Sequence, residues 1–140
     1  MHILLVGSGR QAYFLARRFL DLGHRVTLVA EEADDAHRLV RALEGVTVVA
    51  GDGARPDVLD DAGALHADAV VAATSEDHRN LVACQMARRV FFVGRTIAVV
   101  KDPDNAEPTE DLCVVGVLDH CDGPAHEEHP TRHLARHQVA

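Results

Sequence analysis

The chain opens with an apolar segment that runs directly into a glycine-containing turn. Residues 3–6 read Ile-Leu-Leu-Val, and residues 7–12 read Gly-Ser-Gly-Arg-Gln-Ala. An uninterrupted apolar run is typical of a central parallel strand that is buried on both faces. Gly7 permits a tight turn out of the strand, Gly9 has no Cβ to keep a diphosphate from the backbone, and Ala12 lets the next helix pack closely. We therefore expect phosphate to bind the free N–H groups at the start of that helix.

Strand and helix patterns alternate along residues 1–118. We expect strands at 2–6, 25–29, 46–50, 69–73, 96–100 and 114–118, and helices at 10–22, 34–43, 56–62, 76–89 and 102–112. Such alternation with short loops implies parallel strands joined by right-handed crossovers. The sequence therefore predicts an α/β fold, a Rossmann-like, doubly wound parallel sheet of six strands in the order 3-2-1-4-5-6. A ligand then binds at the carboxyl edge of the sheet, where the strand order reverses.

Composition narrows the classes of protein to be considered. The apolar content of 47% in 140 residues supplies the core of one domain without disulfides, and the three cysteines fit reduced thiols of the cytoplasm. A formal charge of -8 argues against nucleic-acid binding. We expect no signal peptide and no direct membrane insertion, because no apolar stretch approaches the roughly 20 residues that span a bilayer.

Residues 119–140 differ from the rest of the chain and are expected to form a polar, His-rich tail with at most one C-terminal helix. His129, His133 and His137 are four residues apart and would share a helix face if that helix formed. Pro130 places the first of them at the cap, and no further ligand completes a metal site by spacing. We therefore expect a solvated tail and no metal.

Polar or small residues follow each of the first four strands, at the edge where the ligand is expected. After the first strand come Ser8, Arg10 and Gln11. Arg10 is expected to lie against the phosphates or to stack on the adenine, and its alternative is an exposed arginine at a helix start.

After the second strand, a carboxylate normally accepts hydrogen bonds from the adenosine ribose hydroxyls. Ala30 holds the first position, and Glu31 and Glu32 follow. Glu31 reaches the ribose if the strand ends one residue later; otherwise the pair is a solvated loop charge, and both interpretations stay open. The absence of a nearby Arg or Lys in the sequence disfavours the 2′-phosphate of NADP and favours NAD or an adenine nucleotide.

The third and fourth strands end in residues with both structural and binding interpretations. Asp52 and Gly53 would lie near the adenine, but Gly and Asp are also ordinary turn residues. Thr74 and Ser75 are expected to contact the ligand, with Ser75 also capping the helix over 76–89. Asp77 and Asn80 are weaker candidates of the same kind. Further along, residues 90–93 read Val-Phe-Phe-Val, which indicates either an association surface or burial under the helices.

Taken together, these residues resemble the TrkA N-terminal (KTN) domain, the N-terminal half of the regulator-of-potassium-conductance (RCK) domain. The resemblance covers residues 1–118. The segments that carry it are Gly7-Ser8-Gly9-Arg10 with Leu15-Ala16, Gly51-Asp52-Gly53 with Pro56 and Val58-Leu59, residues 67–74, Asn80-Leu81, and Lys101-Asp102-Pro103. The sequence departs from the family pattern at four positions. Ala12 replaces the third glycine, Ala30 stands where the family's ribose acid falls, Lys101 replaces an asparagine, and Val99 a frequent arginine.

The resemblance implies a cytoplasmic ligand-sensing domain, peripheral to the inner face of the cell membrane, that forms a homodimer or a higher ring on a potassium channel or transporter subunit. It implies NAD(H) or ATP/ADP as the ligand, bound by the glycine loop, the acid after the second strand, the Gly-Asp turn and the threonine after the fourth. The family's second, C-terminal ligand domain is not part of these 140 residues.

The sequence leaves three functions open. The favoured one is a regulatory nucleotide-binding domain that catalyses no reaction. The alternatives are the cofactor domain of an NAD-dependent oxidoreductase and a ligand-free assembly domain of the same fold. The oxidoreductase is disfavoured because Tyr13, the sole tyrosine, lacks a lysine four residues later, and because the 22 residues after 118 are too few for a substrate domain.

Overall fold

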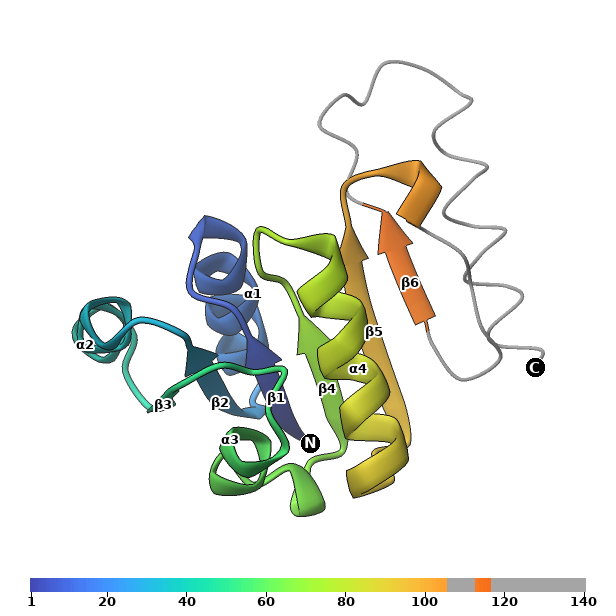
Figure 1. The fold of residues 1–140 in the computed structure, drawn as a ribbon. Helices are drawn as coiled ribbons and strands as arrows, with labels where there is room; N and C mark the ends of the chain where they lie inside the picture. Colours follow the sequence, from blue (N-terminus) through green and yellow to red (C-terminus); the bar gives the residue numbers. More distant parts are fainter. Residues whose placement is uncertain (106–112, 117–140) are drawn as a thin grey trace.

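The computed structural model describes residues 1–105 and 113–116 of the chain (Figure 1). Within them, six parallel strands form one sheet in the order β3-β2-β1-β4-β5-β6. The strands are β1 (His2–Val6), β2 (Arg25–Ala30), β3 (Thr47–Ala50), β4 (Ala69–Ala72), β5 (Arg95–Val100) and β6 (Cys113–Gly116). The predicted doubly wound, Rossmann-like sheet and its strand order are therefore confirmed.

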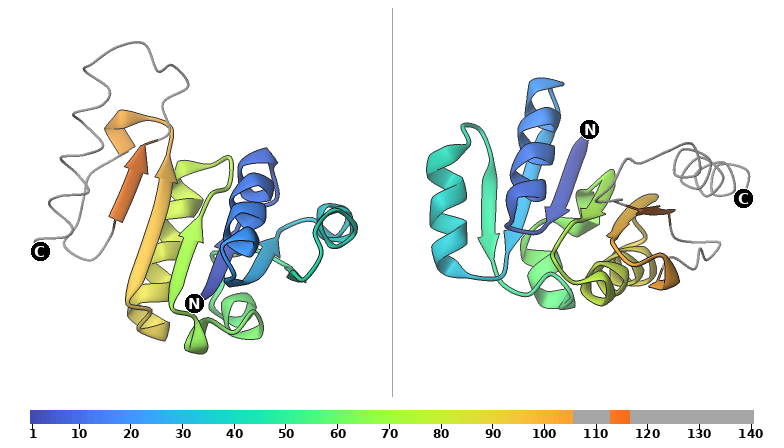
Figure 2. Two further views of the ribbon diagram at one scale, coloured as in Figure 1. Left: turned by 180° about the vertical axis from the view of Figure 1, so that it is seen from behind. Right: turned by 90° about the horizontal axis from the view of Figure 1, so that it is seen from above.

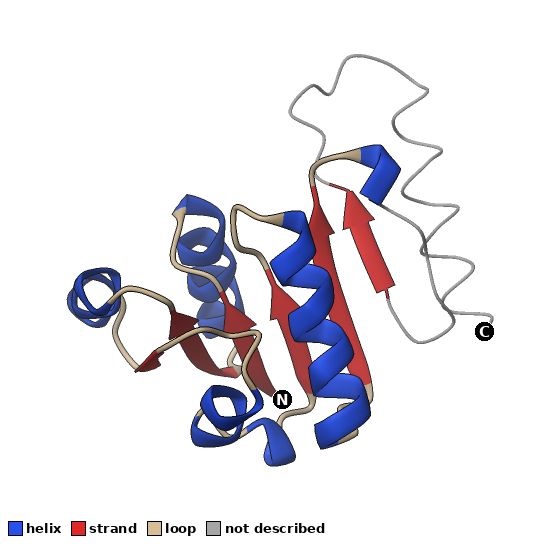
Figure 3. Cartoon of the chain, in the orientation of Figure 1, coloured by secondary structure: helices blue, strands red, loops and turns tan. Residues whose placement is uncertain are grey.

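In the part of the chain that the structure describes, four α-helices and two short 3-10 turns lie between these strands. They are α1 (Arg10–Asp21), α2 (Ala33–Ala42), α3 (Pro56–Asp61), η1 (Ala64–His66), α4 (Asp77–Phe91) and η2 (Pro103–Asn105). Figure 3 shows the helices flanking the sheet, and Figure 2 shows the same arrangement from behind and from above. Among the described residues, no helix combines the length and the apolar character needed to cross a bilayer.

The strand and helix bounds differ from the predicted ones by one or two residues at most elements. β2 continues to Ala30 rather than ending at Val29, which changes the position of the following loop. The turn η1 was not predicted. Residues 103–105 form a 3-10 turn where the helix over 102–112 was expected. The rest of that helix, residues 117–118 of the last strand, and the tail with its histidines lie outside the described residues.

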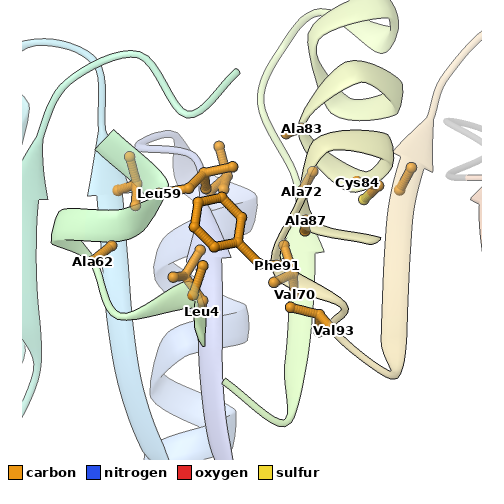
Figure 4. Packing of buried hydrophobic residues seen from close by; sticks show 14 of the residues in the cluster. Leu4, Leu59, Ala62, Val70, Ala72, Ala83, Cys84, Ala87, Phe91 and Val93 are labelled. Carbon is orange, nitrogen blue, oxygen red and sulfur yellow. The ribbon is translucent and has the colours of Figure 1, made fainter. Parts of the chain in front are cut away.

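Alternating side chains of the central strand feed two apolar clusters, one on each face of the sheet. Leu4 and Val6 point to the face covered by α3 and α4, whereas Ile3 and Leu5 point to the face covered by α1 and α2. In Figure 4 the ring of Phe91, near the end of α4, lies beside Leu4. This two-sided burial is why residues 3–6 of β1 read as an uninterrupted aliphatic run.

The apolar run at residues 90–93 divides between the two interpretations. Phe91 and Val93 are buried in the cluster under α4. Val90 is partly exposed, and Phe92 is 82% exposed with a left-handed φ of 56° at the C-cap of α4. The run is thus half core and half surface.

Candidate functional site

The loops after β1, β2, β3 and β4 enclose a cleft of about 430 Å³ at the carboxyl edge of the sheet. All ten candidate binding residues from the sequence line this cleft. They are Gly7, Ser8, Gly9, Arg10, Gln11, Glu31, Asp52, Gly53, Thr74 and Ser75. Arg79 and Lys101 also line it, and sequence reasoning had not assigned either of them to the site.

The two glycines of the first loop have different physical reasons to be glycine. At Gly7, φ is +147° and a Cβ would lie 2.7 Å from the carbonyl oxygen of Ala73, so the approach of this loop to the end of β4 excludes a side chain. A Cβ at Gly9 would meet no atom within 4 Å. Gly7 is therefore needed by the fold, whereas Gly9 keeps the space in front of α1 open.

The start of α1 presents unpaired backbone donors to the cleft. The Gly7 N–H is used by the fold, because it donates to the carbonyl of Val29 at 2.9 Å. The amides of residues 8–11 donate to no backbone or side-chain acceptor among the described residues. The first turn of α1 carries no acidic side chain and no side-chain cap, so the positive end of the helix dipole is uncompensated. This arrangement is a preformed anion site.

The hydroxyl of Ser8 turns away from the cleft. Its Oγ donates to Oδ2 of Asp35 on α2 at 3.2 Å, and Arg38 forms an ion pair with the same carboxylate. Ser8 therefore offers the cleft its backbone amide rather than its side chain.

The extra residue in β2 makes Glu31 the first residue beyond the strand, which is the condition the sequence analysis set for it to reach a ribose. Its carboxylate lines the cleft and forms an ion pair with Nη1 of Arg79 from α4. Nε of Arg79 also lies 3.0 Å from a carboxylate oxygen of Glu76. The hydrogen bond to Glu31, together with the charges of Glu31, Glu76 and Asp52, raises the pKa of Arg79.

The turn after β3 has a structural explanation beside its place in the cleft. Oδ1 of Asp52 accepts the amide of Ala54 at 2.9 Å, which closes an Asx turn. A Cβ at Gly53 would lie 2.2 Å from Cγ1 of Val6, so only glycine fits between this turn and β1. The carboxylate of Asp52 nevertheless lines the cleft.

The residues after β4 require two corrections. The N-cap of α4 is Glu76 and not Ser75, and its own amide donates to Oγ1 of Thr74 at 3.3 Å. Asn80 does not line the cleft, because it is fully buried and holds the loop from beneath. It accepts the Thr74 amide at 2.8 Å and donates to the Val99 carbonyl at 2.7 Å.

Asp77 is also a structural residue rather than a cleft residue. Its carboxylate accepts the amides of Lys101 and Asp102, both at 2.9 Å, and the side-chain amide of Asn105 at 3.1 Å. Burial raises the pKa of Asp77, but these hydrogen bonds outweigh it and the pKa is lowered. Asp77 thereby fixes the loop that brings Lys101 to the cleft.

No cluster of three or more His, Cys, Asp or Glu side chains suited to a metal occurs within residues 1–105 and 113–116. The parallel sheet, the glycine turn, the open amides and the acid after β2 define the class of Rossmann-like nucleotide-binding domains. The model of the TrkA-N domain matches residues 3–118, so this chain belongs to the TrkA-N family.

Curated relatives extend the family assignment. The chain is 33% identical over 138 residues to the Trk system potassium uptake protein TrkA of Vibrio alginolyticus, which covers 97% of this chain and 30% of the relative. It is 35% identical over 107 residues to TrkA of Streptomyces coelicolor, covering 76% of this chain and 48% of the relative. The chain thus spans less than half the length of these relatives.

Solved structures give the same picture. The GsuK channel bound to NAD shares 27% identity with a TM-score of 0.67, covering 79% of this chain and 21% of that one. GsuK bound to ADP shares 29% identity with a TM-score of 0.63, and the match covers 74% of this chain and 27% of that one. The TrkA-N domain of the inner membrane protein ybaL of Escherichia coli has a TM-score of 0.69 at 18% identity, with 99% and 93% covered, and shows the shared fold alone.

Proposed function

We propose that this chain is a regulatory nucleotide-binding domain that acts on a potassium channel or transporter subunit. The observation that carries the proposal is the row of amides at residues 8–11, which donate to no acceptor among the described residues and open into the same cleft as the carboxylate of Glu31. A diphosphate bound on the amides places an adenosine ribose toward Glu31, as in other dinucleotide folds. Membership of the TrkA-N family and the NAD and ADP bound to GsuK support this reading.

NAD(H) and ADP or ATP share the ADP group, and that group is what the cleft suits. Its volume of about 430 Å³ lies within the range of small-molecule sites. Arg10 and Lys101 supply positive charge for phosphate oxygens, and Thr74 supplies a hydroxyl beyond the diphosphate. The sequence shows no Arg or Lys near Glu31, which disfavoured NADP, but in the fold Arg79 of α4 lies beside that carboxylate, so the expected lack of a cation is wrong. The carboxylates of Glu31 and Asp52 still disfavour a 2′-phosphate.

We expect the domain to bind its nucleotide without catalysing a reaction on it. Tyr13, the sole tyrosine, does not line the cleft, and its hydroxyl accepts a hydrogen bond from Arg17 at 3.4 Å. The nucleotide would act by its difference in affinity between two arrangements of paired domains, which biases a linked membrane gate. Pairing is expected as a homodimer or ring, with the exposed Val90 and Phe92 as apolar surface for it. The open cleft argues against a ligand-free assembly domain.

Calorimetric titration of the chain with NADH, ADP and ATP tests the binding step. Gly9→Val fills the space before α1 and should abolish binding. Gly94→Val is the matched control, because a Cβ at Gly94 also meets nothing within 4 Å and this residue lies outside the cleft. Failure of the unaltered chain to bind any of the three at millimolar concentration overturns the proposal. For the regulatory step, rubidium uptake by cells carrying the parent transport system should respond to Gly9→Val and not to Gly94→Val.

A further inference from the structure

Arg79 is a charged residue of the cleft that has no role in the nucleotide binding proposed above. It sits in the first turns of α4, yet its guanidinium reaches Glu31 at the end of β2, 48 residues away in the sequence. The ion pair joins two walls of the cleft, the β2 loop and α4. The amides, Glu31 and the threonine would serve a nucleotide without it.

Stability does not explain this arginine. The side chains of Arg79 and Glu31 are 35% and 49% exposed, and the Glu76 partner is 64% exposed. Exposed ion pairs contribute little to folding, since solvent screens them and ordering two long side chains costs entropy. A ligand can therefore separate the pair at small cost.

The charges around Arg79 indicate what it does instead. Three carboxylates, those of Glu31, Glu76 and Asp52, act on this one guanidinium and together raise its pKa. Two of them line the cleft, and Arg79 is the cation that forms an ion pair with one of these two, Glu31, so its removal would leave that carboxylate without this ion pair when a nucleotide enters. Ribose recognition needs such an acid, but every phosphate of the ligand is repelled by it.

We propose that Arg79 is a specificity-determining residue that makes the affinity of the cleft depend on the number of phosphates in the nucleotide. It neutralises the acidic wall next to the ribose, and its guanidinium has donors not used by Glu31 and Glu76 that can bind phosphate oxygens. The inference rests on the proposed function, because it assigns a selectivity to the same nucleotide site.

The test compares AMP, ADP and ATP, without divalent cations, on the unaltered chain and three variants. Arg79→Gln removes the charge, and Arg79→Lys restores it without the planar fork. Arg89→Gln is the matched control, because it removes the same charge from an exposed position at the far end of α4, outside the cleft. Each titration is made at about 50 mM and about 500 mM salt, where screening is weak and strong respectively.

We expect each added phosphate to tighten binding in the unaltered chain. In Arg79→Gln that gain should shrink by about threefold or more per phosphate at low salt, and the difference should narrow at high salt. Arg79→Lys should recover most of the gain, and Arg89→Gln should keep all of it. If Arg79→Gln weakens the binding of all three nucleotides by the same factor, Arg79 only holds Glu31 in place and the inference is overturned. Unchanged affinities in Arg79→Gln would overturn it as well. If the unaltered chain binds no nucleotide, the proposed function itself fails.

Discussion

Replacement of Asn80 by alanine should destabilise the protein strongly, although Asn80 does not itself line the cleft. The side chain is fully buried under the loop after β4. It accepts hydrogen bonds from the amide and the hydroxyl of Thr74, and it donates to the carbonyls of Thr74 and Val99. One amide group thus ties the cleft loop to β5.

The magnitude follows from which partners water can reach after the change. Thr74 is partly exposed, so water can replace its lost hydrogen bonds at little cost. The bond to Val99 is buried, and an orphaned buried carbonyl costs about 1–3 kcal/mol. With the net loss of the other bonds, the free energy of unfolding should fall by about 2–4 kcal/mol. For a domain of this size, the melting temperature then falls by roughly 6–15 °C.

Urea unfolding followed by circular dichroism measures this loss, with His78→Ala as the control. His78 is exposed on the same turn of α4, and its replacement should change the free energy of unfolding by less than about 0.5 kcal/mol. Asn80→Asp keeps the acceptor for Thr74 but removes both donors, so it should be at least as destabilising as alanine. If the free energy of unfolding of Asn80→Ala lies within about 0.5 kcal/mol of that of the unaltered protein, the hydrogen bonds of Asn80 do not stabilise the fold. That result would refute the reasoning.

Three further predictions come from individual backbone and charge environments. Gly7→Ala should lower the free energy of unfolding by about 2 kcal/mol or more, because φ is +147° and a Cβ would contact the carbonyl of Ala73. Gly9→Ala should change it by less than about 1 kcal/mol, since a Cβ there meets no atom within 4 Å. Equal losses for the two variants in urea titrations would contradict this prediction. The pKa of Asp77 lies below its ordinary value of 3.8, so its contribution to stability is complete above that pH and is lost as the pH falls through the folded-state pKa. Asp77→Asn should therefore be less stable at neutral pH and lose less stability between about pH 5 and pH 3, and parallel pH profiles would argue against the assignment. Phe92→Gly should raise the free energy of unfolding by about 1 kcal/mol, because glycine relieves the left-handed φ of 56° at a solvent-exposed C-cap. A lower free energy of unfolding for this variant, measured at high dilution, would contradict the prediction and show that the ring packs within one chain.

The strands could be predicted because burial on both faces leaves a simple pattern. The apolar run at residues 3–6, for example, lies in the sheet with its side chains alternating between two clusters. Element ends were less predictable, since the last residue of a strand depends on its neighbour. Ala30 belongs to β2 because Ala50 of β3 pairs with it, and nothing local to Ala30 indicates that partner.

The candidate site was predictable as a set because parallel strands bring their carboxyl ends to one edge. The loops after the first four strands converge on one cleft wherever that topology holds. The roles of single residues were less accessible. Asp77 and Asn80 have the chemistry of ligand contacts, but their hydrogen-bonding capacity is taken up within the protein. Asp77 bonds the amides of Lys101 and Asp102, and Asn80 bonds Thr74 and the carbonyl of Val99 in β5.

Arg79 and Lys101 were missed for a related reason. Each lies at a position whose meaning depends on a partner distant in the chain, Glu31 for the arginine and the Asp77 carboxylate for the lysine amide. The sequence nevertheless contains one indication of a cation in the site. Two acidic residues, Glu31 and Glu32, follow a predicted strand at the edge where an anionic ligand is expected. Such an excess of negative charge demands a cation nearby.

Ala30, where this chain departs from the family pattern, and Arg79 are connected by the repulsion between a carboxylate and an anionic ligand. With alanine where the family's ribose acid falls, the nearest carboxylate is Glu31, the first residue beyond the end of β2. At that position the carboxylate is half exposed and stands in the same cleft as the phosphate-binding amides, where it repels a polyanionic ligand. Arg79 removes the repulsion while leaving the carboxylate oxygens able to accept further hydrogen bonds. The two residues therefore work as a unit, and the effect of replacing either one is to be measured against the number of charges on the ligand.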